Sequence, residues 1–143
     1  MDMFELLKRE TDALLFRETK FLGIQDKLKL LGENGCYILA ILSGFGCSSL
    51  DEMLMVTDKL VQKGLLSPTY EVLSNKKLAE ELGLTYTYST TKPEDCLFYI
   101  KEYFNQRTGY THFVLCMNGK NYDTLSASTT VKEGTVRSYR VFN

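Results

Sequence analysis

The sequence has little of what most metal enzymes and nucleic-acid-binding proteins depend on. It holds one histidine, four cysteines, two prolines and no tryptophan in 143 residues. Its 17 lysines and arginines are balanced by 18 acidic residues, so the basic excess typical of nucleic-acid binders is missing. No run reaches the roughly 18 apolar residues that a membrane-spanning helix needs. We therefore expect neither a nucleic-acid partner nor a membrane.

The scarcity of metal-ligating residues also bears on cofactors. Cys36, Cys47, Cys96 and Cys116 are scattered, with no paired spacing, and a single histidine adds no cluster. A zinc site needs clustered ligands, so no metal or other cofactor is expected. The N-terminal residues alternate between apolar and charged side chains, unlike a secretory signal peptide. These features predict a cytoplasmic protein with reduced thiols.

What the sequence does contain is the pattern of one domain over residues 1–143, with no linker, repeat or low-complexity stretch. Apolar spacing and capping residues predict helices over residues 3–18, 36–43, 49–64, 75–82 and 91–104. The last of these rests on a capping-box pattern, Thr91-Lys-Pro-Glu94, with proline in the first turn.

The final third of the chain changes to the composition of strands. Strands are predicted over residues 84–90, 110–117, 120–124 and 135–142. Asn118-Gly119 is a strong hairpin signal, so the strands on either side should pair antiparallel. In the last strand, alternation places Arg137 and Arg140 on opposite faces. The whole pattern predicts an α+β fold, with an N-terminal helical part packed on a C-terminal antiparallel sheet.

Two distant segments hold residues that together suit nucleophilic catalysis. Cys36 follows Gly35 at the expected start of an apolar helix, where unpaired N–H groups favour a thiolate. His112, the only histidine, lies on a predicted strand and is the only imidazole that can serve as base. The returning strand of the hairpin carries Asp123, which can orient the imidazole, and Asn121 is a rival for that role.

The order of these residues resembles that of papain-like cysteine peptidases. "NGCYILAIL" at 34–42 is similar to the nucleophile helix of small bacterial members, such as double-glycine leader peptidases and cell-wall peptidases. "THFVLCMNGKNYDTL" at 111–125 is similar to their histidine strand and the aspartate that follows it. The resemblance implies a papain-like fold and a hydrolase that cleaves a peptide or amide bond. In that enzyme Cys36 attacks, His112 is the base and then the acid, and Asp123 orients His112.

One position departs from that family. Its members carry a glutamine shortly before the nucleophile to hold the oxyanion, and this chain has Leu30 in that stretch. Asn34, Gln25 or backbone N–H groups at the helix start are the remaining candidates for that role. The departure leaves a second interpretation open, a catalytically inactive papain-like domain that binds a peptide or protein. A third is a helix-turn-helix, suggested by "NKKLAEELGLTY" at 75–86, although the following residues are rich in β-formers.

Overall fold

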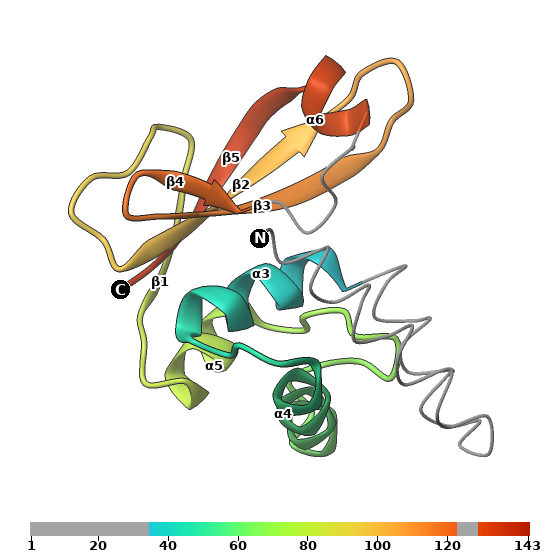
Figure 1. Ribbon diagram of the computed structural model, residues 1–143, viewed down its shortest axis with the longest axis vertical. Coiled ribbons are helices and arrows are strands. Elements are labelled where there is room, and N and C mark those ends of the chain that lie inside the picture. The colour runs from blue at the N-terminus through green and yellow to red at the C-terminus, as the bar shows by residue number, and fades with distance from the viewer. Residues whose placement is uncertain (1–34, 123–128) are drawn as a thin grey trace.

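The computed structural model describes residues 35–122 and 129–143 (Figure 1). In these segments helices form one layer and antiparallel strands form another, which confirms the predicted α+β class. The helix expected over residues 3–18 lies outside the described segments, as do Gln25, Asn34 and Asp123. Within the described segments, no helix is both long enough and apolar enough to cross a membrane.

Three helices of the described segments belong to the helical layer, and all three were predicted. They are α3 (Cys36–Phe45), α4 (Leu50–Gln62) and α5 (Asn75–Glu81). Serine caps begin the second and third. The Ser49 hydroxyl accepts a hydrogen bond from the backbone N–H of Glu52 at 3.2 Å. The Ser74 hydroxyl accepts a hydrogen bond from the backbone N–H of Lys77 at 3.3 Å. Each cap satisfies an N–H group that the start of a helix leaves unpaired.

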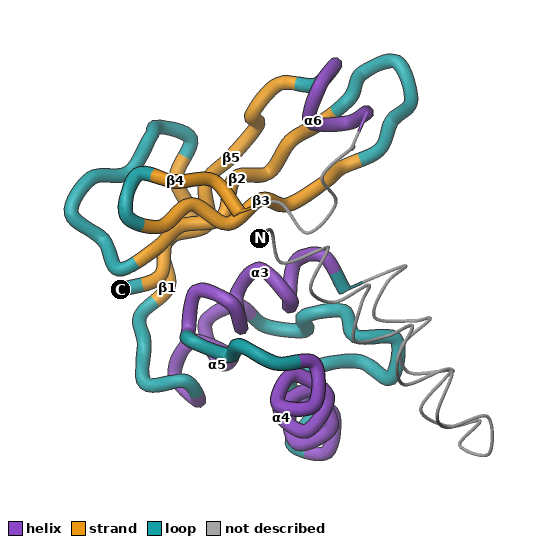
Figure 2. The backbone as a smooth tube through the Cα atoms, in the orientation of Figure 1, coloured by secondary structure: helices purple, strands orange, loops and turns teal. Residues whose placement is uncertain are grey.

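The second layer is a five-stranded antiparallel sheet (Figure 2). Its strands are β1 (Tyr86–Ser89), β2 (Phe98–Phe104), β3 (Thr111–Met117), β4 (Lys120–Tyr122) and β5 (Thr135–Phe142). Their order in space is β1-β5-β2-β3-β4. A short helix, α6 (Thr129–Glu133), precedes β5 and was not predicted.

The hairpin between β3 and β4 forms at the predicted turn. Asn118 and Gly119 both have positive φ angles, 55° and 74°, as a two-residue turn of the right twist requires. This turn fixes the register of β3 against β4, with Cys116 opposite Asn121.

The helix predicted over residues 91–104 is wrong. Residues 90–97 carry no helix or strand, and Phe98–Phe104 is β2, the central strand of the sheet. The apolar residues at 97, 100 and 104 fit a helical period, but the same segment is rich in aromatic β-formers. Pairing with β5 on one side and β3 on the other satisfies its backbone along its length, and this outweighs the local capping signal.

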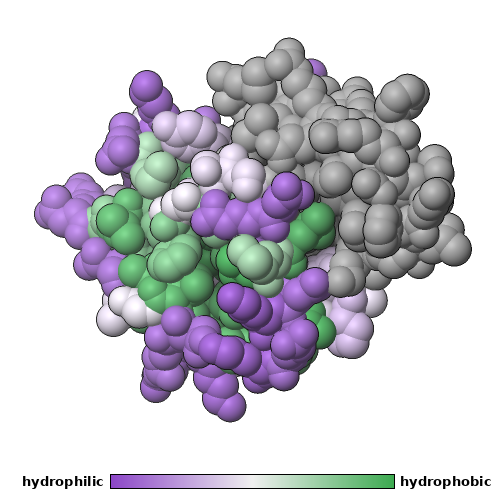
Figure 3. All heavy atoms as spheres, turned by 60° about the horizontal axis from the view of Figure 1, so that its bottom comes forward, coloured by the Kyte–Doolittle hydropathy of each residue, from purple (hydrophilic) through white to green (hydrophobic). Residues whose placement is uncertain are grey.

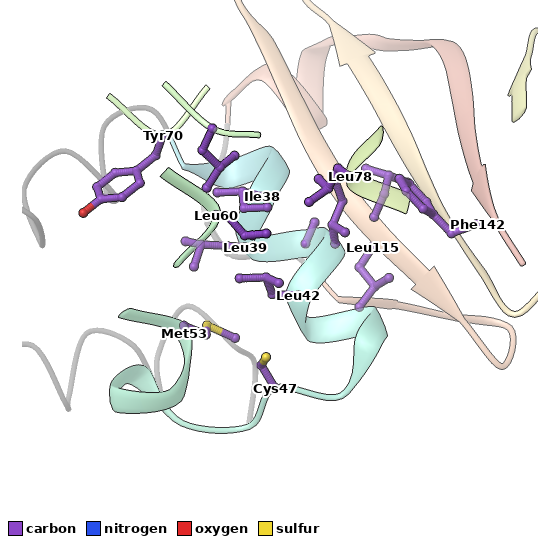
Figure 4. Packing of buried hydrophobic residues seen from close by; sticks show 14 of the residues in the cluster. Ile38, Leu39, Leu42, Cys47, Met53, Leu60, Tyr70, Leu78, Leu115 and Phe142 are labelled. Atoms are coloured by element: carbon purple, nitrogen blue, oxygen red, sulfur yellow. The ribbon is translucent and has the colours of Figure 1, made fainter. Parts of the chain in front are cut away.

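The core surrounds α3, with one face of the sheet on one side and buried residues of α4 and α5 also packed against it, below the sheet in Figure 1. Ile38 and Leu42 of α3 pack with Leu115 of β3 and Phe142 of β5 (Figure 4). We call this side of the sheet the inner face and the opposite side the outer face. Because strand side chains alternate, each strand residue can be assigned to one of the two faces.

The helical layer also has a surface of its own. Turned to bring the bottom of Figure 1 forward, the molecule shows apolar side chains bordered by hydrophilic ones (Figure 3). Met55 of α4 and Leu73, just before α5, are large apolar residues exposed in this part of the chain. Individual exposed apolar residues are common on protein surfaces, so Met55 and Leu73 by themselves identify no site.

Candidate functional site

Cys36 opens α3, as the sequence predicted. It is the first residue of the helix, its side chain is partly exposed, and Gly35 before it is the N-cap. No side chain of the described residues caps this end. A helix start of this kind carries partial positive charge from its unpaired N–H groups. We call residues 35–37 the head of α3.

His112 lies on the other side of the sheet. Its neighbour Phe113 packs on Tyr37 of the α3 head, with ring centroids 4.6 Å apart, so Phe113 is on the inner face. Leu115 on the same face belongs to the core shared with α3. Alternation along β3 therefore places His112 on the outer face, where its side chain is buried. Because α3 packs on the inner face, Cys36 and His112 belong to opposite sides of the sheet, and no contact joins them in the part of the chain that the structure describes.

The candidate orienting residues fall into two groups. Asn121 pairs with Cys116 and shares the outer face with His112. Its side-chain oxygen accepts a hydrogen bond from the Lys101 ammonium at 3.1 Å. Asp123 and the two candidate oxyanion residues, Asn34 and Gln25, lie outside the described residues. Two members of the predicted triad, Cys36 and His112, are therefore described, and they lie on opposite sides of the sheet.

A buried carboxylate lies on the inner face next to Phe113, the residue that packs on Tyr37. Glu102 of β2 lies on the inner face with 6% of its surface exposed. It accepts hydrogen bonds from Arg137 Nε at 2.8 Å, Ser138 Oγ at 3.2 Å and Arg140 Nη2 at 3.3 Å. Burial acts to raise the pKa of this carboxyl, but the hydrogen bond and charge of Arg137, with the charge of Arg140, hold the pKa below its usual value. We call these four residues the Glu102 network.

A β-bulge brings both arginines to one carboxylate. The pairing of β2 with β5 shifts from Glu102 with Ser138 to Tyr103 with Val136, which leaves Arg137 as an extra residue. Regular alternation is interrupted there, so Arg137 and Arg140 both reach Glu102. The predicted placement of these two arginines on opposite faces is therefore wrong.

Aromatic rings connect the Glu102 network to the head of α3. The Arg140 guanidinium lies 5.9 Å from the ring centre of Tyr37, 5.8 Å from that of Phe113 and 5.1 Å from that of Tyr88. These are cation–π distances. The Tyr37 hydroxyl also donates to the side-chain oxygen of Asn75 at the start of α5. Burial raises the pKa of Tyr37, so it remains a neutral donor at physiological pH.

Sequence reasoning missed the Glu102 network because its members come from two strands with no shared motif. The one available signal was a glutamate within the apolar run of β2, since a buried carboxylate requires charged partners. Among the described residues, no group of three histidine, cysteine, aspartate or glutamate side chains is placed to hold a metal ion.

Comparison of the chain with protein-family models, with curated proteins and with solved structures finds no match. The segment after α5 is the strand β1 and not a second helix, so the helix-turn-helix pattern is not completed there.

Proposed function

We propose that this α+β domain is a catalytically silent, papain-like protein that binds a peptide or protein segment at the head of α3. One observation carries the proposal. Tyr37, the residue after Cys36, packs on Phe113 and lies beside the Arg140 guanidinium, whereas strand alternation assigns the only imidazole to the other face of the sheet. A cysteine hydrolase needs a base within hydrogen-bond reach of the thiol. The hydrolase built on Cys36, His112 and Asp123 stays a prediction, and it requires β3 to turn His112 to the inner face.

The groups around the head of α3 favour a ligand that carries a carboxylate. Arg137 and Arg140 outnumber Glu102, so the Glu102 network has a net positive charge. The Arg137 side chain is 48% exposed and its guanidinium lies 4.5 Å from the ring centre of Phe104. A guanidinium held in this way can bind a carboxylate by donating two parallel hydrogen bonds to it. The unpaired N–H groups of the helix start add to the attraction.

The catalytic alternative is tested by the reactivity of Cys36. Its alkylation by iodoacetamide is followed by peptide mass spectrometry between about pH 5 and 9, a range that spans the ordinary imidazole pKa. We expect the same pH dependence in the wild type, in His112→Ala and in His112→Gln, the last retaining a polar side chain at this buried position. Reaction at acid pH that disappears in both variants would overturn the proposal and support the hydrolase.

Binding is tested with acidic and basic probes. A ¹⁵N-labelled chain is titrated with tetra-glutamate, and with tetra-lysine as the charge control. We expect tetra-glutamate alone to shift the amide signals of Cys36, Tyr37 and Arg137, and Arg137→Ala to remove these shifts. Arg107→Ala is the matched control, because it removes an exposed arginine that pairs with Glu133 and not with Glu102. Equal shifts in both variants, or none with tetra-glutamate, would contradict binding at the head of α3.

A further inference from the structure

The strand β1 forms one edge of the sheet. In the described segments it pairs with β5 alone. Just before β1, Thr85 and Asn143 exchange both backbone hydrogen bonds, at 2.8 and 3.1 Å. Such reciprocal pairs alternate with pairs that exchange none, so Thr87 bonds to β5 while Tyr86 and Tyr88 direct their N–H and C=O groups outward. The edge therefore presents two residues ready to pair with another strand.

The sequence of this edge is close to a palindrome. Residues 85–89 read Thr-Tyr-Thr-Tyr-Ser, with Thr87 at the centre. Thr87 is exposed on the outer face, and Tyr88 is 53% exposed on the inner face. The segment contains no charged residue and no proline, the two residue types that usually protect sheet edges.

We propose that β1 pairs antiparallel with β1 of a second copy of this chain, about a two-fold axis at Thr87, and so joins the two sheets. The outward residues then meet as Tyr86 of one copy with Tyr88 of the other, and each such pair exchanges both N–H···O bonds. On the inner face these are aromatic pairs, and on the outer face Thr87 meets its own equivalent. Both pair types are favourable across antiparallel strands.

Because the β1 edge is complementary to itself, we infer that the strand that pairs with it is β1 of a second copy of the chain. A two-fold dimer requires that one surface patch match itself, and a palindromic strand with outward groups on both sides of its centre does so. The opposite edge lacks this property. β4 is three residues long and exposes Lys120, a charged residue typical of protected edges.

The oligomeric state of the full chain tests the proposal by sedimentation velocity between about 1 and 100 μM, which brackets micromolar association. We expect a dimer at the upper end. Thr87→Lys places like charges opposite each other at the two-fold axis and should weaken dimerisation by about tenfold or more. Thr111→Lys adds the same charge at an exposed residue of β3 and should leave the dimer unchanged.

A charge-swap experiment identifies the contact itself. Thr87→Glu should also be monomeric, and an equimolar mixture of Thr87→Glu with Thr87→Lys should recover the dimer. A wild type that stays monomeric, a dimer that Thr87→Lys leaves intact, or a mixture that stays monomeric would each overturn the proposal. The inference rests on β1 and not on the head of α3, so these outcomes leave the proposed binding function unaffected.

Discussion

Arg137 donates to the same carboxylate of Glu102 as Arg140, although the two arginines are three positions apart on one strand. In a regular strand that spacing places side chains on opposite faces. The bulge at Arg137 interrupts the alternation of side chains between the two faces of β5. Both arginines therefore reach the buried Glu102 carboxylate. The Glu102 network thereby ties the centre of the sheet to the aromatic rings at the head of α3.

Removal of the carboxylate should destabilise the fold. Glu102→Ala leaves Arg140, whose side chain is 19% exposed, without the carboxylate that pairs with it. We expect a loss of about 3 kcal/mol, the lower end for breaking a buried ion pair, because Arg137 retains access to water. Chemical denaturation checks the value. Glu81→Ala is the control, since its pair with Lys63 is exposed on both sides, and it should change stability little. Equal effects of the two substitutions would contradict a structural role for the Glu102 network.

The same carboxylate should make stability depend on pH. The pKa of Glu102 is lower in the folded chain than its usual value, despite the opposing effect of burial. Its stabilising contribution is therefore complete above the unfolded pKa of about 4.3 and is lost as the pH falls through the folded pKa. Denaturation from about pH 7 to 3 should show a steeper loss for the wild type than for Glu102→Gln. Subtracting the stability of Glu102→Gln from that of the wild type at each pH removes the contribution of the other carboxylates. Parallel stability curves for the two proteins would argue against the prediction.

The sequence predicts elements whose signals are local. Serine caps and Asn118-Gly119 locate α4, α5 and the hairpin because each acts within a few residues. Phe98–Phe104 was assigned to a helix because its sheet partners are distant in sequence, and only those partners decide its conformation.

The site was harder to predict than the fold. The side chains of β3 are apolar on both faces, with Val114 1% and Leu115 2% exposed, so the sequence does not say which face meets α3. The prediction assigned His112 to the face of Cys36, whereas Phe113 occupies that face. The bulge at Arg137 leaves no pattern in a single sequence, and the Glu102 network depends on it.

A substitution at Gly44 tests how closely α3 packs against the sheet at Phe98. A Cβ at this position would lie 2.6 Å from the ring of Phe98, which is fully buried in β2. Gly44→Ala should therefore cost about 1–3 kcal/mol of stability through overpacking, although alanine favours helices in general. In a Phe98→Leu background, which removes the ring, the same substitution should cost less. A double-mutant cycle by denaturation measures this coupling, and strictly additive effects would show that the contact imposes no constraint.

The Cys47 thiol should react more slowly than the Cys36 thiol with an alkylating reagent. Burial, followed by the charge and hydrogen bond of Glu52, raises the pKa of the Cys47 thiol to about 11. Only 4% of the residue is exposed, whereas Cys36 is partly exposed. At pH 8 iodoacetamide should modify Cys36 well before Cys47, because the thiolate is the reacting species. Glu52→Gln keeps a polar side chain at the start of α4 but removes the charge, so it should lower the Cys47 pKa and speed its alkylation. Peptide mass spectrometry follows both thiols in one sample, and a Cys47 rate that Glu52→Gln leaves unchanged would assign the protection to burial alone.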